Sequence, residues 1–303
     1  MIVKGKETTK RINKVEIYLI LLVLVFSGLF LLNQKGKQII NKQQEATKDS
    51  NQLFQKDKQR TSDNNSIIQP TEPQNISPEN KNKVNDFGAV GSLNHQYLQA
   101  NPYSRIVIEI DYEETVQPDQ SAINTFISTL KQYSDKPGGV SQTGNNSFIS
   151  LKETYSTSDL LNLTQKHRVN YSGGDTITLY ILFINGSFAQ NNNALGVALN
   201  SSMLVVFKDK INQTATALVF ASEIERAVLN HELGHLLGLI NINYKSSIDH
   251  EDANNPYHSN NEESVMFWVV EDISVVNLFR GGPPYQFDLA DKHDLEKIKK
   301  GEY

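Results

Sequence analysis

Within the stretch His-Glu-Leu-Gly-His at positions 231–235 of this 303-residue chain, three side chains could act together in chemistry: His231, Glu232 and His235. On a helix, residues four apart lie on the same face, so His231 and His235 project in one direction. Two imidazoles held in this way can each donate a nitrogen to one zinc ion. Glu232 is rotated away from that line and can take a proton from a water molecule at the metal. The spacing therefore predicts one Zn²⁺, with Glu232 as the general base.

The sequence around this motif resembles the metzincin metallopeptidases, whose extended pattern is HExxHxxGxxH followed by a methionine turn. Residues 231–241 read HELGHLLGLIN, which matches that pattern through Gly238 and departs from it at Asn241. The family has its third ligand histidine at that last position. An amide oxygen is a weak zinc ligand beside imidazole or carboxylate, so this departure leaves the third ligand open.

A second stretch, residues 258–267, resembles the archaemetzincin segment that runs from the third ligand histidine to the methionine turn. The resemblance implies that His258 is the third zinc ligand and that Met266 forms the apolar floor beneath the metal. Ser259 and Ser264 stand where that family has cysteines, which implies that its additional thiolate-bound zinc is absent. The resemblance also implies a metzincin-like domain that hydrolyses peptide bonds, with an edge strand that pairs with an extended substrate.

The alternative third ligand is His250, which lies in an acidic loop that reads Asp-His-Glu-Asp at residues 249–252. If His258 is the ligand, residues 241–257 form a loop between the glycine turn and that histidine. The oxygens of the acidic loop could instead bind calcium, or could simply be solvated. The sequence leaves His258, His250 and Asn241 as candidates for the third position.

The motif needs a helix, and the sequence predicts one that begins at Ser222. Ser222 and Glu225 have the spacing of a capping box, in which each side chain satisfies a backbone N–H at the start of a helix. Apolar residues then recur at helical spacing and would pack the helix against a sheet. Gly238 is the predicted end of the helix, because glycine readily takes the left-handed conformation that terminates helices.

The remainder of residues 96–303 alternates strands and helices, so we expect an α/β (α+β) metzincin-like domain with a twisted mixed sheet. Apolar and charged residues alternate at positions 105–112, which predicts a strand with one solvated face. Glycine and asparagine pairs at positions 138–146 predict a loop. The small residues at positions 194–198 form the candidate edge strand. Further strands are predicted at residues 176–184 and 202–207, and helices at 119–133, at 158–168 and after Asp288, with Leu289, Leu295 and Ile298 facing inward.

The N-terminal part of the chain has the pattern of a membrane anchor. Residues 1–14 are basic, residues 15–32 are apolar and just long enough to cross a bilayer as a helix, and residues 33–95 have the polar composition of a disordered linker. The positive charge before the apolar run predicts that residues 96–303 lie outside the cytoplasm, on a single-pass protein of the cell membrane. A cleaved signal peptide is the alternative, with the same location for the domain.

Composition narrows the range of functions. The chain has no cysteine, which excludes disulfides and a thiolate nucleophile, and its net charge of −5 without a basic stripe argues against a nucleic-acid partner. The predicted function is therefore that of a membrane-anchored zinc endopeptidase whose substrate is a polypeptide. The alternatives are a metal-dependent hydrolase of a non-peptide amide and a catalytically silent binding domain on a tether.

Overall fold

The computed structural model describes residues 85–150, 152–270 and 282–303. The expected cytoplasmic segment, residues 1–14, and the expected anchor, residues 15–32, lie outside the described residues. Within the described ranges, no helix combines the length and the apolar character needed to cross a membrane. The end of the expected linker is packed, since Asp86 is buried and its carboxylate accepts hydrogen bonds from the backbone and side chain of Ser172.

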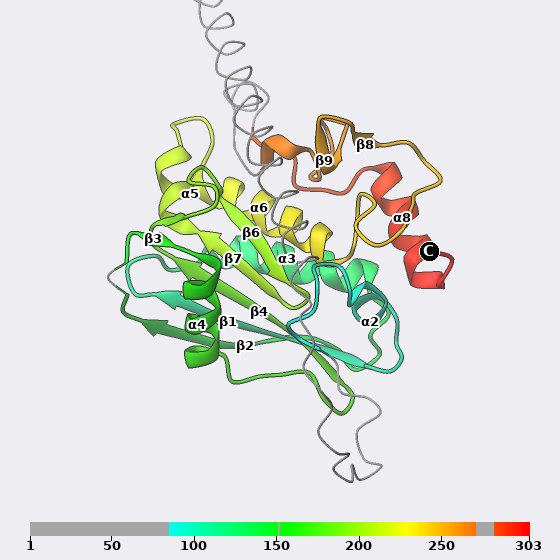
Figure 1. The fold of residues 1–303 in the computed structure, drawn as a ribbon, viewed down its shortest axis with the longest axis horizontal. Coiled ribbons are helices and arrows are strands. Elements are labelled where there is room, and N and C mark those ends of the chain that lie inside the picture. Colours follow the sequence, from blue (N-terminus) through cyan, green and yellow to red (C-terminus); the bar gives the residue numbers. More distant parts are fainter. Residues whose placement is uncertain (1–84, 151, 271–281) are drawn as a thin grey trace, which may run out of the picture. The chain divides into compact units, whose positions relative to one another are not determined.

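A five-stranded sheet with the order β2-β1-β4-β7-β6 lies at the centre of the domain (Figure 1). Four of its strands are parallel, and β6 runs antiparallel to β7. The predicted mixed α/β fold is thus confirmed, with β6 in an edge position close to the expected one. The strands are β1 (Arg105–Glu113), β2 (Gly139–Phe148), β4 (Thr176–Ile184), β6 (Gly196–Asn200) and β7 (Met203–Phe207).

Helices cover both faces of this sheet, which explains the continuous apolar run of β4. Helices α3 (Gln120–Tyr133) and α6 (Ala221–Leu236) pack on one face, and α4 (Thr157–His167) packs on the other (Figure 1). Successive side chains of a strand point to opposite faces, so a strand covered on both sides is apolar throughout. In β4, Leu179 and Ile181 join the core with α3 and α6, whereas Tyr180 and Leu182 join the core with α4.

The charged face of β1 is buried, so the prediction of a solvated face for residues 105–112 is wrong. Glu109, Asp111 and Glu113 are at most 3% exposed. Their carboxylates are satisfied by donors on the α4 side of the sheet: the Asn170 backbone N–H donates to Glu109 at 2.7 Å, and the Tyr180 hydroxyl donates to Asp111 at 3.0 Å. Buried carboxylates are tolerated because they are hydrogen-bonded.

The segment at residues 138–146, predicted to be a loop, is largely an edge strand. Strand β2 pairs in parallel with β1, and the register shifts between Ile110 and Asp111, opposite Gly144 and Asn145, which both have positive φ. Most of its side chains are exposed, so the strand needs few apolar residues. Glycine and asparagine mark the bulge in this strand rather than a turn that ends it.

The remaining elements are short, apart from the last helix. They are α2 (Asn94–Leu98), β3 (Thr154–Tyr155), β5 (Ser187–Phe188), α5 (Lys208–Thr214), β8 (Glu251–Asp252), β9 (Asn255–Ser259), η1 (Trp268–Val270) and α8 (Leu289–Lys300). The predicted capping role of Asp288 in α8 is confirmed, because its side chain accepts a hydrogen bond from the Asp291 N–H. Leu295 and Ile298 face inward as predicted, but Leu289 is 84% exposed, which corrects its assignment.

Candidate metal centre

Helix α6 carries the His-Glu-Leu-Gly-His motif, and its start differs from the predicted one. The helix begins at Ala221, and the Glu223 carboxylate accepts a hydrogen bond from the Phe220 N–H at 2.9 Å. The predicted capping box of Ser222 and Glu225 is therefore wrong by two residues.

The carboxylate of Glu225 is used instead to hold α6 in place from the side. It is fully buried, pairs with the Lys208 ammonium of α5, and accepts a hydrogen bond from the Asp119 N–H at the start of α3. Burial raises the pKa of Glu225, while the charge of Lys208 acts in the opposite direction. This one side chain therefore links α6 to both α5 and α3.

The end of α6 follows the prediction. Gly238 has a φ of +82°, and its N–H donates to the His235 carbonyl at 3.0 Å. A Cβ atom at this position would also lie 2.9 Å from the Asn94 side-chain nitrogen. Both the backbone conformation and the close approach of α2 therefore require glycine here.

Three histidines converge beside α6. One nitrogen of each of His231, His235 and His258 lies within 4.8 Å of the others, and the Nε2 atoms of the first two are 3.1 Å apart. The ring centroids are 4.8–5.2 Å apart in all three pairs. His258 reaches this group from β9, which forms a hairpin with β8. The helix thus supplies two imidazoles and the hairpin supplies the third.

Backbone carbonyls orient two of these rings. Nδ1 of His231 lies 2.6 Å from the Val265 carbonyl oxygen, and Nδ1 of His258 lies 3.0 Å from the Pro256 carbonyl oxygen. Because a carbonyl can only accept, each Nδ1 donates its proton to the carbonyl, and in a neutral ring of this tautomer the lone pair lies on Nε2. Carbonyl acceptors of this kind orient metal-binding histidines in general.

The donor set fits a zinc ion. Catalytic zinc sites use three protein ligands with bonds of about 2.0–2.1 Å and leave one position open. Two nitrogens on one such ion would be separated by about 3.4 Å in tetrahedral geometry, close to the 3.1 Å between the Nε2 atoms of His231 and His235. The three histidines could therefore hold one zinc ion.

The other two candidates for the third ligand lie elsewhere. The Asn241 amide donates to the Glu251 carboxylate at 2.7 Å and accepts from the Ser246 N–H at 2.7 Å. Nε2 of His250 lies 2.9 Å from Asp294 Oδ2 of α8, in a separate cluster. Of the three candidates, only His258 lies beside the two helical histidines.

Calcium was the other possibility for the acidic loop at residues 249–252. The Asp252 carboxylate accepts hydrogen bonds from the Asn254 backbone and the Asn255 side chain, and Glu251 accepts from Asn241 and from the Tyr257 backbone. These oxygens hold the β8–β9 hairpin together. They form no group of possible metal ligands in the described part of the chain.

Glu232 faces the edge strand of the sheet. Its side chain is buried, and a Cβ atom added at Gly196 of β6 would lie 3.0 Å from Glu232 Oε1 and 2.5 Å from Val228 Cγ1. Only glycine therefore lets β6 approach α6 this closely. The sequence pointed to small residues at positions 194–198, but nothing in it singled out Gly196 as the contact with the motif glutamate.

Met266 packs directly against the helical turn between the two motif histidines. It is fully buried, and a Cβ atom at Gly234 would lie only 2.1 Å from its sulfur. The Met266 N–H donates to the Ser264 hydroxyl at 2.9 Å, and its carbonyl accepts from the Ser259 N–H at 2.8 Å. These backbone contacts hold Met266 against α6. The close packing of Met266 explains why position 234 is a glycine.

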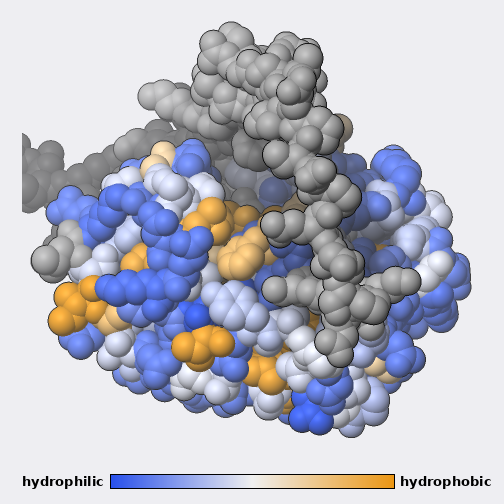
Figure 2. Space-filling model, turned by 60° about the horizontal axis from the view of Figure 1, so that its bottom comes forward, coloured by the Kyte–Doolittle hydropathy of each residue, from blue (hydrophilic) through white to orange (hydrophobic). Residues whose placement is uncertain are grey.

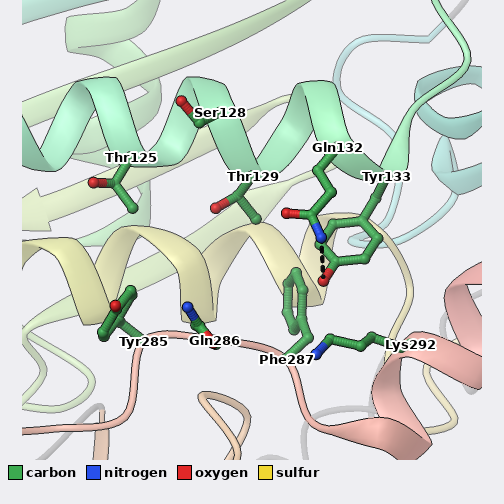
Figure 3. A pocket seen from close by; sticks show the side chains of 9 residues that line it. All are labelled: Thr125, Ser128, Thr129, Gln132, Tyr133, Tyr285, Gln286, Phe287 and Lys292. Carbon is green, nitrogen blue, oxygen red and sulfur yellow. Dashed lines mark hydrogen bonds between the residues drawn. The ribbon is translucent and has the colours of Figure 1, made fainter.

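A separate hollow lies between α3 and residues 285–287, and Figure 3 shows the side chains that line it. It has a volume of about 210 Å³ and includes none of the three histidines. Small-molecule sites are usually about 300–1,000 Å³ and mostly apolar. Threonine, serine, glutamine and lysine side chains line this hollow alongside its aromatic rings, so it is a weaker candidate for a functional site.

The apolar side chains on one face of the domain give no stronger candidate. On the face that Figure 2 shows, apolar side chains form small groups set among polar ones. Surface hydrophobic residues that are scattered in this way are normal for a folded domain. The three histidines with Glu232 therefore form the best candidate site in the described residues.

Neither a protein-family model nor a curated protein sequence matches the chain. It is similar to the crystal structure of archaemetzincin from Methanopyrus kandleri, with 15% sequence identity and a TM-score of 0.42 over 65% of this chain and 97% of that one. It is also similar to metalloproteinase-II from Bacteroides fragilis, with 14% identity and a TM-score of 0.39 over 66% of this chain and 55% of that one.

Proposed function

We propose that this protein is a zinc-dependent endopeptidase with His231, His235 and His258 as the metal ligands and Glu232 as the general base. The observation that carries the proposal is the convergence of three imidazole nitrogens within 4.8 Å, next to the helical turn that holds this glutamate. Imidazole nitrogens are donors that zinc prefers, and backbone carbonyls orient two of these three rings.

A bound zinc ion would polarise the scissile carbonyl and lower the pKa of a water molecule toward about 7. Glu232 would accept a proton from the attacking water and then deliver it to the leaving amine nitrogen, which must be protonated to depart. The carboxylate is suited to this role because it is buried between α6 and β6, where bulk water competes little for the proton. Met266 supports the turn from the opposite side and takes no part in proton transfer.

The position of β6 supports a peptide as the substrate. Within the described residues this strand pairs with β7 on one side only, so an extended chain could add to its other edge. Val197, Ala198 and Leu199 are partly exposed along the strand. Gly196, the first residue of the strand, lies against the Glu232 side chain. A peptide paired with β6 would therefore pass the proposed general base.

The test is Glu232→Gln, which keeps the shape of the side chain and removes its basicity. We expect this variant to retain wild-type zinc content and to lose at least about 100-fold in the rate of cleavage of an unfolded protein substrate, the lower range for general-base catalysis. Glu296→Gln is the matched control, because this glutamate is exposed on α8 and pairs with the exposed Lys300, and it should cleave like the wild type. Full cleavage by the Glu232 variant would contradict the mechanism.

The third ligand has its own test. We expect His258→Ala to lower zinc affinity, measured by competition with a chelator, far more than Asn241→Ala, because the Asn241 amide contacts the hairpin and not the histidine group. Zinc binding without cleavage of any peptide in a library would favour a non-peptide amide as the substrate. A wild-type domain without stoichiometric zinc would favour a silent binding role.

We further propose that residues 15–32 anchor the protein in the cell membrane, with residues 96–303 on the extracytoplasmic side. The apolar length of that run and the basic residues before it support this arrangement. Protease added to intact cells should degrade the domain, and the full chain should sediment with membranes. An N-terminus that begins after the apolar run would instead identify a cleaved signal peptide.

A further inference from the structure

A second group of possible metal ligands lies between the β8–β9 hairpin and α8. One ligand atom of each of His250, Asp288 and Asp291 lies within 4.8 Å of the others. His250 immediately precedes β8, Asp288 is the N-cap of α8, and Asp291 lies in its first turn. Figure 1 shows α8 beside this hairpin. His250 is 3% exposed and Asp291 is fully buried, so this is an interior cluster.

Two buried atoms of this cluster face each other without a hydrogen bond. They are Nδ1 of His250 and Oδ1 of Asp291, which are 3.6 Å apart. This separation is too long for a hydrogen bond, which has a heavy-atom distance of about 2.7–3.2 Å. It is close to the separation of about 3.4 Å between two ligands of one tetrahedral ion with bonds of about 2.1 Å.

The other polar atom of each of these two side chains has a hydrogen-bond partner. These partners fix the orientation of both side chains, and so the positions of His250 Nδ1 and Asp291 Oδ1. His250 Nε2 lies 2.9 Å from Asp294 Oδ2. Asp291 Oδ2 accepts from the Ser264 hydroxyl at 2.5 Å and from the Asp288 N–H at 3.0 Å. Each side chain is therefore held from one end and presents its remaining atom to a shared point.

The charge of the cluster also calls for a cation. The carboxylates of Asp288, Asp291 and Asp294 surround one imidazole, and the last two are fully buried. Even a protonated His250 would supply one positive charge against three negative ones. Buried charges are strongly disfavoured unless they are paired or coordinate a metal.

We propose that His250, Asp288 and Asp291 bind a second divalent cation, and that this cation is zinc. An imidazole nitrogen with two carboxylates is a donor set that suits zinc, whereas calcium and magnesium prefer oxygen ligands alone. This site is separate from the group of His231 and its partners. The proposal therefore does not depend on the peptidase function.

The role of this second ion is structural. The His250 carbonyl accepts a hydrogen bond from the Asn260 N–H at 2.8 Å, and the β8–β9 hairpin between these two residues carries His258. An ion shared by His250 and the first turn of α8 would fix the base of this hairpin. It would thereby hold His258 in position relative to α6.

The test measures zinc per chain in proteins from which the first group of ligands has been removed. We expect two zinc ions per wild-type chain and one in the His231→Ala/His235→Ala variant, with no zinc when Asp291→Asn is added to that variant. Zinc should also raise the melting temperature of the double variant, and Asp291→Asn should abolish this shift. Failure of the peptidase proposal would not change the zinc content of the double variant.

Asp291 also caps a helix, so its loss needs a matched control. Asp159 has the equivalent position in the capping box of α4, away from the cluster. Asp159→Asn in the double-variant background should therefore keep the zinc that Asp291→Asn loses. Asp288→Asn offers a milder change, because asparagine is an equally good N-cap, and it should weaken zinc binding at least tenfold. A folded double variant that binds no zinc, or equal zinc binding with and without Asp291, would overturn the proposal.

Discussion

Replacement of Gly234 by alanine would test how tightly Met266 packs under the motif. The new Cβ atom would lie 2.1 Å from Met266 Sδ, 3.0 Å from its Cε and 3.1 Å from Phe287 Cε1. Ordinary contacts between such atoms are about 3.5–4.0 Å, so the sulfur would have to move by about 1.5 Å. Met266 is fully buried, and its backbone is hydrogen-bonded on both its N–H and its carbonyl, so neither an open space nor a backbone shift can relieve the overlap easily.

The expected magnitude follows from two opposing effects. Overpacking of a well-packed core costs about 1–3 kcal/mol, and alanine in place of glycine inside a helix contributes about 1 kcal/mol in the opposite direction. Because the overlap is severe and Met266 is fully buried, we expect Gly234→Ala to lower the free energy of unfolding by about 1–2 kcal/mol. For a domain of this size the melting temperature should fall by about 2–8 °C.

Thermal unfolding followed by circular dichroism would measure this change, in the presence of chelator so that metal binding does not contribute. Gly173→Ala is the matched control, because a Cβ atom there has no neighbour within 4 Å, and it should melt at or slightly above the wild-type temperature. Gly234→Ala/Met266→Ala should be less destabilised than the sum of its single variants, since the new methyl group partly fills the cavity. A Gly234→Ala protein that melts at or above the wild-type temperature would refute the packing argument.

Two further predictions concern buried and capping charges. Lys208→Met leaves the fully buried Glu225 without its ion-pair partner, so we expect the free energy of unfolding, measured in urea, to fall by about 3–5 kcal/mol. Lys208→Met/Glu225→Leu should recover part of this loss. A loss below about 1 kcal/mol would show that this carboxylate does not depend on the lysine. Hydrogen bonds from Lys152 and Ser156 lower the pKa of Asp159 from 3.8 to about 2. Its carboxylate therefore stabilises the fold above about pH 4 and loses that effect as the pH falls toward 2. Asp159→Asn should lower the melting temperature at pH 6 more than at pH 2, and an equal change at both would contradict this assignment.

Several elements were predictable because their signals are local. The apolar run of β4 and the capping residues Asp119 and Asp288 act within a few residues of themselves, and the structure has them where the sequence predicts. The errors arose where distant segments decided the outcome. The carboxylates of β1 are buried because donors from distant segments, among them Asn170 and Tyr180, bond to them, and the pattern of residues 105–112 holds no signal of those donors. Glu225 has the spacing of a capping residue, but its carboxylate pairs with Lys208 instead.

The same distinction between local and distant signals applies to the proposed active site. The sequence by itself determined that His231 and His235 share a helix face with Glu232 beside them, because helix geometry follows from hydrogen bonds between residues four apart. Which of His258, His250 and Asn241 lies beside that pair depends on the tertiary structure alone, because the sequence offers all three as similar donors within one polar segment. The β8–β9 hairpin turns one imidazole toward α6 and leaves the other facing α8, and that choice depends on packing between elements distant in the chain.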